Sequence, residues 1–293
     1  MRIFITGGGG FIGQHLVRLL TGHHDLMLVG RQPRVFHHPR IDYLQSNLHD
    51  PESWKKKISA FNPNACIHLA WDGLPDYSLE NNLRNFNLSL RLYQLLIDTG
   101  CRRIFTSGTC WEYGRLQGKV CESDMPETTN LFASFKTGLR LAKQSLAEEQ
   151  GINWIWGRLF FVYGPGQRNE SLIPYCYHSL KQNRLPELST PGAVNDFIHV
   201  EDAAAAIMAL IETPDLNGVF NIGTGIPENV TNIRRLVAKT MTAEDIICPD
   251  QCDSTPTGNW ADISLITQKT NWKPVISLES GINNTIRQME GVL

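Results

Sequence analysis

Short apolar stretches alternate with longer amphipathic stretches through the first half of the chain. The apolar stretches predict β-strands over residues 1–6, 26–29, 65–69, 103–106 and 153–156. The amphipathic stretches predict helices, the two longest of which cover residues 83–99 and 131–149. Gly100 and Gly151 follow these two helices as C-terminal caps. This alternation predicts an α/β fold with a doubly wound parallel sheet.

A glycine-rich turn joins the first predicted strand to the helix that follows it. The turn reads TGGGGFIG from Thr6. Glycines let the backbone pass close to a ligand, and the start of a helix presents unpaired N–H groups to phosphates. The spacing fits GxGxxG from Gly8 or TGxxGxxG from Thr6 through Gly7, with Gly10 and Gly13 common to both. Either register predicts a site for the pyrophosphate of a dinucleotide, and the motifs described below favour the second.

The alternation weakens after residue 165, where Pro174, Pro186 and Pro191 divide shorter elements. We therefore expect residues 1–165 to form a dinucleotide-binding Rossmann domain. Residues 166–293 should form mainly a smaller C-terminal substrate-binding lobe, with some segments returning to the Rossmann domain. Such a lobe covers the carboxyl edge of the sheet, where doubly wound folds bind their ligands.

The composition restricts the class of protein. A chain of 293 residues with 42% hydrophobic and 19% charged residues can bury a large core in one or two globular domains. A net charge of -2 gives no attraction to a phosphate backbone, so we expect no nucleic-acid partner. No apolar run approaches the length of a membrane span, and the apolar start runs into glycines, unlike a signal peptide. We expect a soluble, cytoplasmic protein with no membrane partner.

The cysteine and histidine patterns indicate free thiols and no metal site. Seven cysteines are an odd number, and their scatter over a large chain suits a reducing compartment. Cys248 and Cys252 are spaced CxxxC without a second pair. The histidines at 23–24 and 37–38 are adjacent pairs whose side chains point in different directions. We therefore expect no bound metal.

The type of dinucleotide depends on the residues after the second predicted strand. About 20 residues beyond the glycine turn, NAD-selective sites usually place an Asp or Glu on the ribose hydroxyls. This chain has Gly30 and Arg31 there, with Arg34 nearby. No carboxylate at that place repels a 2'-phosphate, and a guanidinium offers it two hydrogen bonds, so we expect NADP. The alternative, a solvated arginine beside an NAD site with different ribose contacts, stays open.

Further motifs follow the glycine turn along the chain. They are Asn47-Leu48, IHLA from Ile67 to Ala70, SGTCWEYG from Ser107 to Gly114, a helix with Lys136, RLFFVYGPG from Arg158 to Gly166, DFIHVED from Asp196 to Asp202 and FNIGTG from Phe220 to Gly225. With these motifs the chain resembles, over nearly its whole length, the extended short-chain dehydrogenase/reductases, in particular their nucleotide-sugar epimerases, dehydratases and ketoreductases. The resemblance implies NADP or NAD as cofactor, a nucleotide-sugar substrate and a homodimer formed through the helices at 83–99 and 131–149.

The resemblance also implies where the cofactor binds. It places Asn47-Leu48 beside the adenine and the IHLA segment beneath the cofactor. Together with the glycine turn and the arginines after the second strand, the expected cofactor contacts are Gly7, Gly10, Phe11, Ile12, Gly13, Arg31, Arg34, Asn47, Leu48, Leu69, Ala70 and Lys136.

In the family, a Ser or Thr, a Tyr and a Lys carry the chemistry. The hydroxyl and the lysine correspond to Thr109 and Lys136 in this chain. The lysine lowers the pKa of the tyrosine and holds the nicotinamide ribose, the tyrosine exchanges a proton with the sugar oxygen, and the Ser or Thr orients that oxygen. Phe132 stands at the tyrosine position, four residues before Lys136. A phenylalanine can neither give nor take a proton.

Three explanations for Phe132 stay open. The phenylalanine is an engineered replacement of the tyrosine. Another group acts in its place, with Thr109, Cys110, Glu112 or a water as candidates. In the third explanation, the protein binds a nucleotide without converting it. Tyr113 belongs to the YG turn, and we expect it to be structural.

The residues after Thr109 bear on the type of reaction. Family dehydratases carry an Asp-Glu pair there, because elimination of water needs an acid and a base, whereas this chain has Cys110-Trp111. Family epimerases retain NAD, while one-way ketoreductases use exchangeable NADPH, so Arg31 favours reduction. We expect reduction of a 4-keto-6-deoxy sugar nucleotide, such as a CDP- or dTDP-linked one. The alternatives are an NAD-retaining nucleotide-sugar epimerase and a catalytically silent dinucleotide-binding protein.

The substrate lobe matches the family less closely. Phe161 stands where the family sometimes has Asn, and Asn195 stands where it often has Arg. Aromatic rings can line a sugar pocket and an arginine can meet a diphosphate. The expected substrate contacts are Trp71, Cys110, Trp111, Tyr163 and Arg168.

Overall fold

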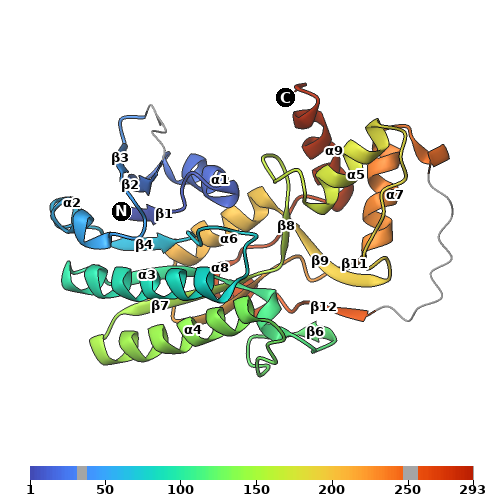
Figure 1. The fold of residues 1–293 in the computed structure, drawn as a ribbon. Coiled ribbons are helices and arrows are strands. Elements are labelled where there is room, and N and C mark those ends of the chain that lie inside the picture. Colours follow the sequence, from blue (N-terminus) through green and yellow to red (C-terminus); the bar gives the residue numbers. More distant parts are fainter. Residues whose placement is uncertain (32–37, 247–256, 293) are drawn as a thin grey trace.

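The computed structural model describes residues 1–31, 38–246 and 257–292. Among these residues, seven parallel strands form the main sheet in the order β10-β7-β5-β4-β1-β2-β3 (Figure 1). The strands are β1 (Arg2–Thr6), β2 (Asp25–Gly30), β3 (Ile41–Gln45), β4 (Ala65–His68), β5 (Arg103–Thr109), β7 (Asn153–Leu159) and β10 (Gly218–Ile222). All five strands predicted from the sequence lie in this sheet, and the prediction of a doubly wound α/β fold is confirmed.

The two edge strands of the main sheet, β3 and β10, were not predicted from the sequence. In β3, Asp42 and Gln45 are exposed, so the apolar signal is short. β10 pairs with β7 although it lies after the start of the predicted lobe. An edge strand buries fewer side chains than a central one and leaves a weaker apolar pattern in the sequence. The main sheet therefore draws one strand, β10, from residues 166–293.

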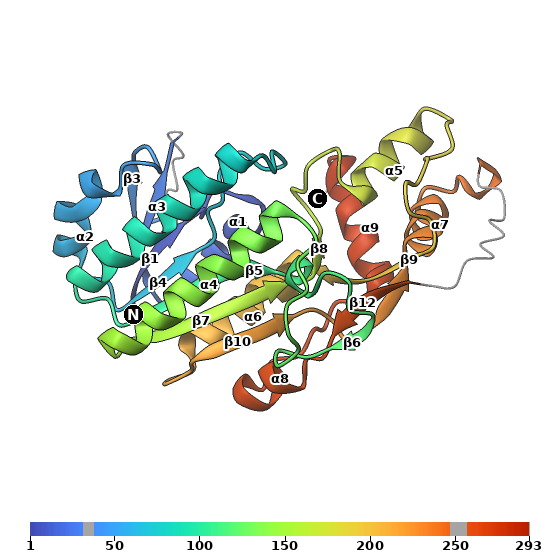
Figure 2. The ribbon, with the colours of Figure 1, turned by 60° about the horizontal axis from the view of Figure 1, so that its bottom comes forward.

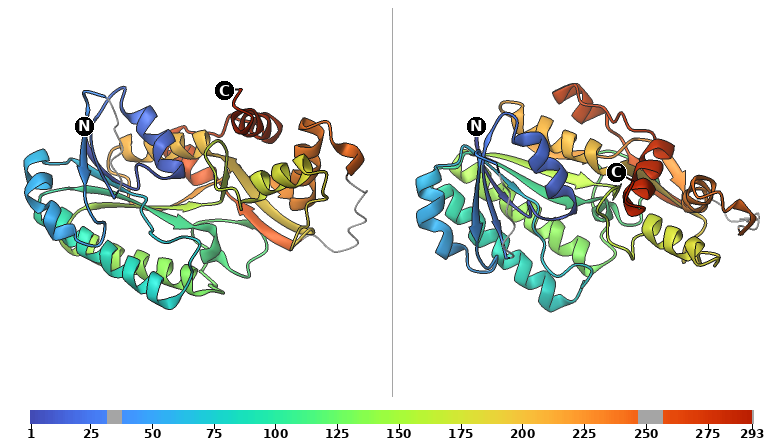
Figure 3. Two further views of the ribbon diagram at one scale, coloured as in Figure 1. Left: turned by 45° about the horizontal axis from the view of Figure 1, so that its top comes forward. Right: turned by 90° about the horizontal axis from the view of Figure 1, so that it is seen from above.

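Helices cover both faces of the main sheet, as Figure 3 (left) shows. One face carries α1 (Phe11–Leu20), α6 (Val200–Glu212) and α8 (Ser264–Thr270). The other face carries α3 (Leu79–Asp98), α4 (Leu131–Gln150) and, after the short turn η1 (Pro51–Trp54), α2 (Lys55–Phe61). Alternate residues of β1 enter the two cores: Ile3 and Ile5 pack with α1 and α6, whereas Phe4 packs with α3.

The two longest helices begin and end at capping residues. Ser78 accepts a hydrogen bond from the N–H of Asn81, so α3 begins about one turn before its predicted start. Asn130 caps α4 in the same way. Gly151 ends α4 in the left-handed conformation with a φ of 60°, and Gly100 follows the last turn of α3 with a φ of 84°. The predicted glycine caps are confirmed.

A smaller lobe lies at the carboxyl end of the main sheet. Its own sheet has the order β11-β9-β12-β6, with β8 paired to β9. Its elements are β6 (Gly118–Val120), β8 (Phe161–Tyr163), β9 (Ala193–His199), β11 (Pro227–Asn229), β12 (Thr257–Ala261), α5 (Leu172–Lys181), α7 (Val230–Thr240) and α9 (Leu278–Met289), with the short turns η2 (Cys110–Tyr113) and η3 (Glu244–Ile246). Figures 1 and 2 show α5, α7 and α9 gathered at the end of the molecule away from α2. β6 joins the lobe from the first half of the chain, so the two halves exchange segments in both directions.

None of the helices in the described ranges is long and apolar enough to cross a membrane. Within the same ranges, no group of three or more His, Cys, Asp or Glu side chains is placed to hold a metal ion. Arg34, Cys248 and Cys252, which the sequence analysis singled out, lie outside the described residues.

Candidate active site

The glycine turn packs so closely that two of its positions have no room for a side chain. Gly7 has a φ of 76°, and a Cβ there would fall 2.8 Å from the backbone nitrogen of Ala70. A Cβ on Gly13 would collide with the carbonyl oxygen of Gly7. The N–H of Gly10 donates to the same carbonyl over 2.9 Å. These contacts favour the register that begins at Thr6.

A cleft of about 590 Å³ opens at this turn. The expected cofactor residues that line it are Gly7, Gly10, Phe11, Ile12, Gly13, Leu69 and Lys136. Ala70 is buried in contact with Gly7. Gly10 is the N-cap of α1, and no side chain caps the N–H groups of that helix. Those N–H groups and the side-chain-free turn fit the pyrophosphate of a dinucleotide.

Arg31, after β2, meets a carboxylate that comes from another strand end. Its Nη2 lies 2.8 Å from Oδ1 of Asp72, which follows β4. His49, after β3, approaches Oδ2 of the same carboxylate at 3.3 Å. Asn47 and Leu48 also follow β3, the first exposed and the second buried. The expectation that no carboxylate lies beside Arg31 is wrong. The carboxylate of Asp72 comes from a different loop, because parallel strands bring the loops after β2, β3 and β4 to one edge of the sheet.

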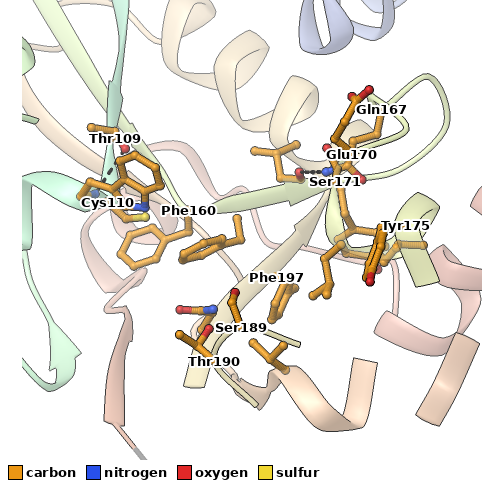
Figure 4. Close-up of a pocket in the computed structure, with 18 of the residues that line it drawn as sticks. Thr109, Cys110, Phe160, Gln167, Glu170, Ser171, Tyr175, Ser189, Thr190 and Phe197 are labelled. Carbon is orange, nitrogen blue, oxygen red and sulfur yellow. Dashed lines mark hydrogen bonds between the residues drawn. The ribbon is translucent and has the colours of Figure 1, made fainter. Parts of the chain in front are cut away.

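A larger cavity of about 810 Å³ is lined by residues of both the main sheet and the lobe (Figure 4). It shares Thr109, Phe132 and Leu159 with the cleft at the glycine turn. The expected substrate residues that line it are Cys110, Trp111 and Tyr163. The two cavities therefore meet at Thr109 and Phe132, two of the positions that the sequence analysis expects at the catalytic centre.

The other two expected substrate residues, Trp71 and Arg168, line the cleft and not the larger cavity. Among the described residues, the larger cavity is lined by the carboxylates of Glu170 and Glu187 and by no lysine or arginine. Of these two cavities, as far as their described residues go, only the cleft is lined by basic side chains, those of Arg168 and Lys136. A diphosphate would therefore meet a positive charge in the cleft and not in the larger cavity.

Lys136 lies one turn after Phe132 on α4, and its side chain is buried. The ammonium donates to the carbonyl oxygen of Ser107 over 2.9 Å and lies 4.0 Å from the ring centroid of Trp71. Desolvation by burial lowers the pKa of Lys136 to about 7, and the charge of Glu112 opposes this shift. Lys136 therefore changes its protonation state near neutral pH.

Thr109 ends β5 and caps the short turn η2. Its Oγ1 accepts from the N–H of Trp111 over 3.2 Å, and its own N–H donates to Oε1 of Glu112 over 3.1 Å. Glu112 is fully buried and also accepts from Nε1 of Trp156 at 2.8 Å and from Nε of Arg158 at 3.0 Å. Both carboxylate oxygens are engaged, so Glu112 positions Thr109 and is not available to a substrate.

Two other groups near Thr109 are also held in the interior. Cys110 is buried, and desolvation raises the pKa of its thiol, which stays protonated at neutral pH. The hydroxyl of Tyr113 is hydrogen-bonded to Oδ1 of Asn221 at 2.7 Å and to the carbonyl of Cys121 at 2.9 Å. These contacts hold Tyr113 in the core, away from a substrate.

Phe132 lies among three aromatic rings. Its ring centroid is 5.6 Å from that of Trp71, 5.8 Å from that of Trp111 and 5.4 Å from that of Tyr77. Tyr77 precedes α3 and lines the larger cavity. The sequence analysis missed Tyr77, because no local motif marks it. The signal that could have identified Tyr77 is its place in a loop that follows a strand of a parallel sheet, where such folds bind ligands.

Both the sequence and the fold are similar to those of known proteins. A family model described as the NAD dependent epimerase/dehydratase family matches residues 3–223. The dTDP-4-dehydro-6-deoxyglucose reductase of Escherichia coli is 24% identical over 311 residues, covering 98% of this chain and 97% of that protein. The structure of UDP-glucose 4-epimerase from Thermotoga maritima with UDP-glucose gives a TM-score of 0.85 at 23% identity and covers 99% of both chains. The structure of UDP-glucuronic acid 4-epimerase from Bacillus cereus with NAD gives a TM-score of 0.85 at 18% identity, covering 100% of this chain and 99% of that one.

Proposed function

The chain belongs to the NAD-dependent epimerase/dehydratase family, and from this we propose that it transfers a hydride between a nicotinamide dinucleotide and a nucleotide-linked sugar. The observation that carries the proposal is the meeting of the two cavities at Thr109 and Phe132, with Lys136 lining the cleft. A dinucleotide in the cleft and a sugar in the larger cavity would have their reacting ends at this junction.

The residues of the cleft and of the junction would have separate roles. The glycine turn and the start of α1 would hold the pyrophosphate, and Lys136 would hold the nicotinamide ribose. A bound nicotinamide supplies or accepts the hydride. The hydroxyl of Thr109, whose position is set by Glu112, orients the sugar oxygen. Phe132 has no hydroxyl, so the proton that accompanies the hydride comes from another group.

We propose reduction of a 4-keto-6-deoxy sugar nucleotide by NADPH as the direction of the reaction. Cys110 and Trp111 follow Thr109, and a thiol and an indole do not provide the carboxyl pair that dehydration requires. Arg31 is exposed and can meet a 2'-phosphate. The similarity to a dTDP-4-dehydro-6-deoxyglucose reductase supports the same choice.

A second candidate is an NAD-retaining nucleotide-sugar epimerase. The ion pair between Arg31 and Asp72 favours it, because Asp72 brings a negative charge to the place where a 2'-phosphate would lie. A carboxylate at the end of these strands is the feature that selects NAD over NADP. Reductase and epimerase therefore differ in their cofactor as well as in their product.

We also propose that the protein is a cytoplasmic homodimer. Leu83 on α3 and Leu141 on α4 are 48% and 52% exposed, although both helices otherwise pack on the sheet and on each other. Exposed leucines on two adjacent helices suit a contact with a second copy of the chain. The cysteines described in the structure carry free thiols, which suits a reducing compartment.

The test follows NADPH and NADH oxidation by absorbance with CDP-, dTDP-, UDP- and GDP-linked 4-keto-6-deoxy sugars. In parallel, the nucleotide released on denaturing the purified protein is identified. Oxidation of NADPH by one of these sugars supports the reductase. Copurified NAD that does not exchange, together with interconversion of two sugar epimers, supports the epimerase. Binding of a dinucleotide without conversion of any sugar would contradict both the reductase and the epimerase. It would favour a dinucleotide-binding protein without catalytic activity.

A further inference from the structure

A hydroxyl group lies beside Phe132 on a neighbouring ring. Tyr77, in the loop between β4 and α3, packs its ring 5.4 Å from that of Phe132 and 5.5 Å from that of Trp111. Tyr77, Phe132 and Thr109 line the same cavity. The ring of Tyr77 therefore packs against the ring that lacks a hydroxyl, although Tyr77 comes from a different part of the chain.

The Tyr77 hydroxyl is available to a substrate. The residue is 39% exposed, and its hydroxyl has no hydrogen bond to any residue that the structure describes. A phenol that bridges a cavity and the solvent can give a proton to a ligand and regain one from water. Neither step requires the surrounding protein to rearrange.

The backbone around Tyr77 is held firmly. Nδ2 of Asn82 donates to the carbonyl of Tyr77 over 2.9 Å, and Nδ2 of Asn81 donates to the carbonyl of Asp76 over 2.8 Å. Both asparagines are buried on α3. The N–H of Ser78 donates to the carboxylate of Asp76 over 2.9 Å. A loop tied to a helix in this way presents its tyrosine in a defined position, which proton transfer requires.

Four other groups at or near the larger cavity are less suited to give the proton. Cys110 is a buried thiol with a raised pKa, and both oxygens of Glu112 are engaged. Tyr163 is buried, and its hydroxyl donates to the carbonyl of Leu278 over 3.4 Å. Tyr175 is as exposed as Tyr77, at 38%, but Figure 4 shows it at the end of the cavity opposite Thr109.

We propose that Tyr77 is the catalytic proton donor that replaces the missing tyrosine at position 132; this rests on the proposed function. In reduction, the O–H bond of Tyr77 breaks and its proton goes to the carbonyl oxygen of the sugar. The carbonyl carbon takes a hydride from the reduced nicotinamide, so the product is an alcohol and the nicotinamide is oxidised. The phenolate of Tyr77 regains a proton from the solvent. In an epimerisation, the phenolate of Tyr77 would take the proton of the sugar hydroxyl while the carbon gives its hydride to the oxidised nicotinamide, and both would return to the keto sugar in the second half of the reaction.

The test compares Tyr77→Phe, Phe132→Tyr and the double variant with the unaltered chain. Tyr77→Phe should lower kcat by about 10²- to 10⁴-fold, the usual effect of removing a positioned general acid. Its affinity for the dinucleotide, measured by quenching of tryptophan fluorescence, should stay as in the unaltered chain, which shows that the variant is folded. In the double variant, the tyrosine at position 132 should restore most of the lost activity.

Tyr175→Phe is the matched control, because it removes the same hydroxyl from an equally exposed tyrosine of the same cavity. Any loss in this variant should appear in KM, with the dependence of kcat on pH kept. In Tyr77→Phe, by contrast, the decrease of kcat at high pH should disappear. A second readout needs no turnover: the ultraviolet difference spectrum between the unaltered chain and Tyr77→Phe reports the surroundings of this phenol. Binding of the positively charged oxidised nicotinamide beside the phenol should change that difference spectrum.

Three results separate the failure of this proposal from the failure of the proposed function. If Tyr77→Phe keeps the kcat of the unaltered chain, or if the oxidised cofactor leaves the difference spectrum unchanged, Tyr77 is not the donor while the function stands. If the unaltered chain is inactive but Phe132→Tyr reduces a sugar, the function of the site stands and Tyr77 again is not the donor. If no form converts any sugar although all bind the dinucleotide, the proposed function fails, and this proposal fails with it.

Discussion

Arg31 and Asp72 form a two-point ion pair, with Nη2 2.8 Å from Oδ1 and Nη1 3.2 Å from Oδ2. The arginine side chain is 61% exposed, whereas that of the aspartate is only 9% exposed. The guanidinium is thus held by a nearly buried carboxylate and is itself exposed to solvent. A 2'-phosphate would have to compete with Asp72 for Arg31, while ribose hydroxyls could bond to both.

Asp72→Asn should shift the cofactor preference toward NADP. The variant removes the negative charge that competes for Arg31, and a charge-assisted hydrogen bond contributes about 1.5 kcal/mol, so the ratio of NADP to NAD affinity should rise about tenfold. Titration calorimetry with both dinucleotides measures this ratio. Asp50→Asn makes the same charge change at an exposed position after β3 and is the control. An unchanged ratio in Asp72→Asn would show that this ion pair does not select the cofactor.

Thr109→Val should reduce kcat while leaving dinucleotide affinity in place. Valine keeps the shape of the threonine but loses the hydroxyl that orients the sugar oxygen and caps η2. The lost cap costs about 1 kcal/mol of stability, which thermal unfolding detects. Thr109→Ser keeps the hydroxyl and should retain activity. Equal activity of the valine and serine variants would remove Thr109 from the proposed chemistry.

Lys136→Met should weaken dinucleotide binding and change how stability depends on pH. Burial lowers the pKa of Lys136 from 10.5 to about 7, so between these values the unfolded chain holds a proton that the folded chain has released. The unfolded state then binds more protons, and the free energy of unfolding rises with pH across this window. Below about pH 7 both states are protonated and the contribution is constant. The variant lacks this rise, so the unaltered chain should gain stability relative to the variant between about pH 7 and pH 10. Chemical denaturation at several pH values measures it, and a pH-independent difference would contradict the assignment.

Glu112→Gln should destabilise the protein strongly. Glu112 pairs with Arg158 in the interior, and breaking a buried ion pair from one side costs about 3–5 kcal/mol, because the other charge stays buried. The N–H of Thr109 loses its charged acceptor at the same time, so kcat should fall as well. Glu279→Gln makes the same change in an exposed ion pair with Lys239 and should leave the melting temperature unchanged. Similar melting temperatures for the two variants would show that the Glu112 network carries little stability.

Leu83→Glu should convert the proposed homodimer to a monomer. A carboxylate at this exposed position of α3 would have to be buried in the contact between two copies, which is costly. Light scattering coupled to size-exclusion chromatography gives the mass. Leu19→Glu places the same charge on α1, across the sheet, and should leave the dimer intact. A monomer at micromolar concentration before any substitution would already contradict the proposal.

The central strands, the two long helices with their caps and the glycine turn could be predicted from the sequence because each is specified by neighbouring residues. The periodic burial of a strand or helix leaves a periodic pattern, and the close approach at Gly7 and Gly13 requires glycine. Thr109 and Lys136 could be proposed as site residues from the sequence, because the family resemblance places each in a contiguous motif. The edge strands β3 and β10 leave weaker patterns because fewer of their side chains are buried.

The tertiary structure decided the partners of these residues. Nothing near Arg31 in the sequence indicates that Asp72 pairs with it, and nothing near Phe132 indicates that Tyr77 lies against its ring. Both contacts form at the carboxyl edge of the parallel sheet, where loops from separate strands converge. The sequence alone determined the scaffold and the hydroxyl missing at Phe132. Only the folded chain, which places distant loops side by side, determined that Asp72 pairs with Arg31 and that the ring of Tyr77 packs against that of Phe132.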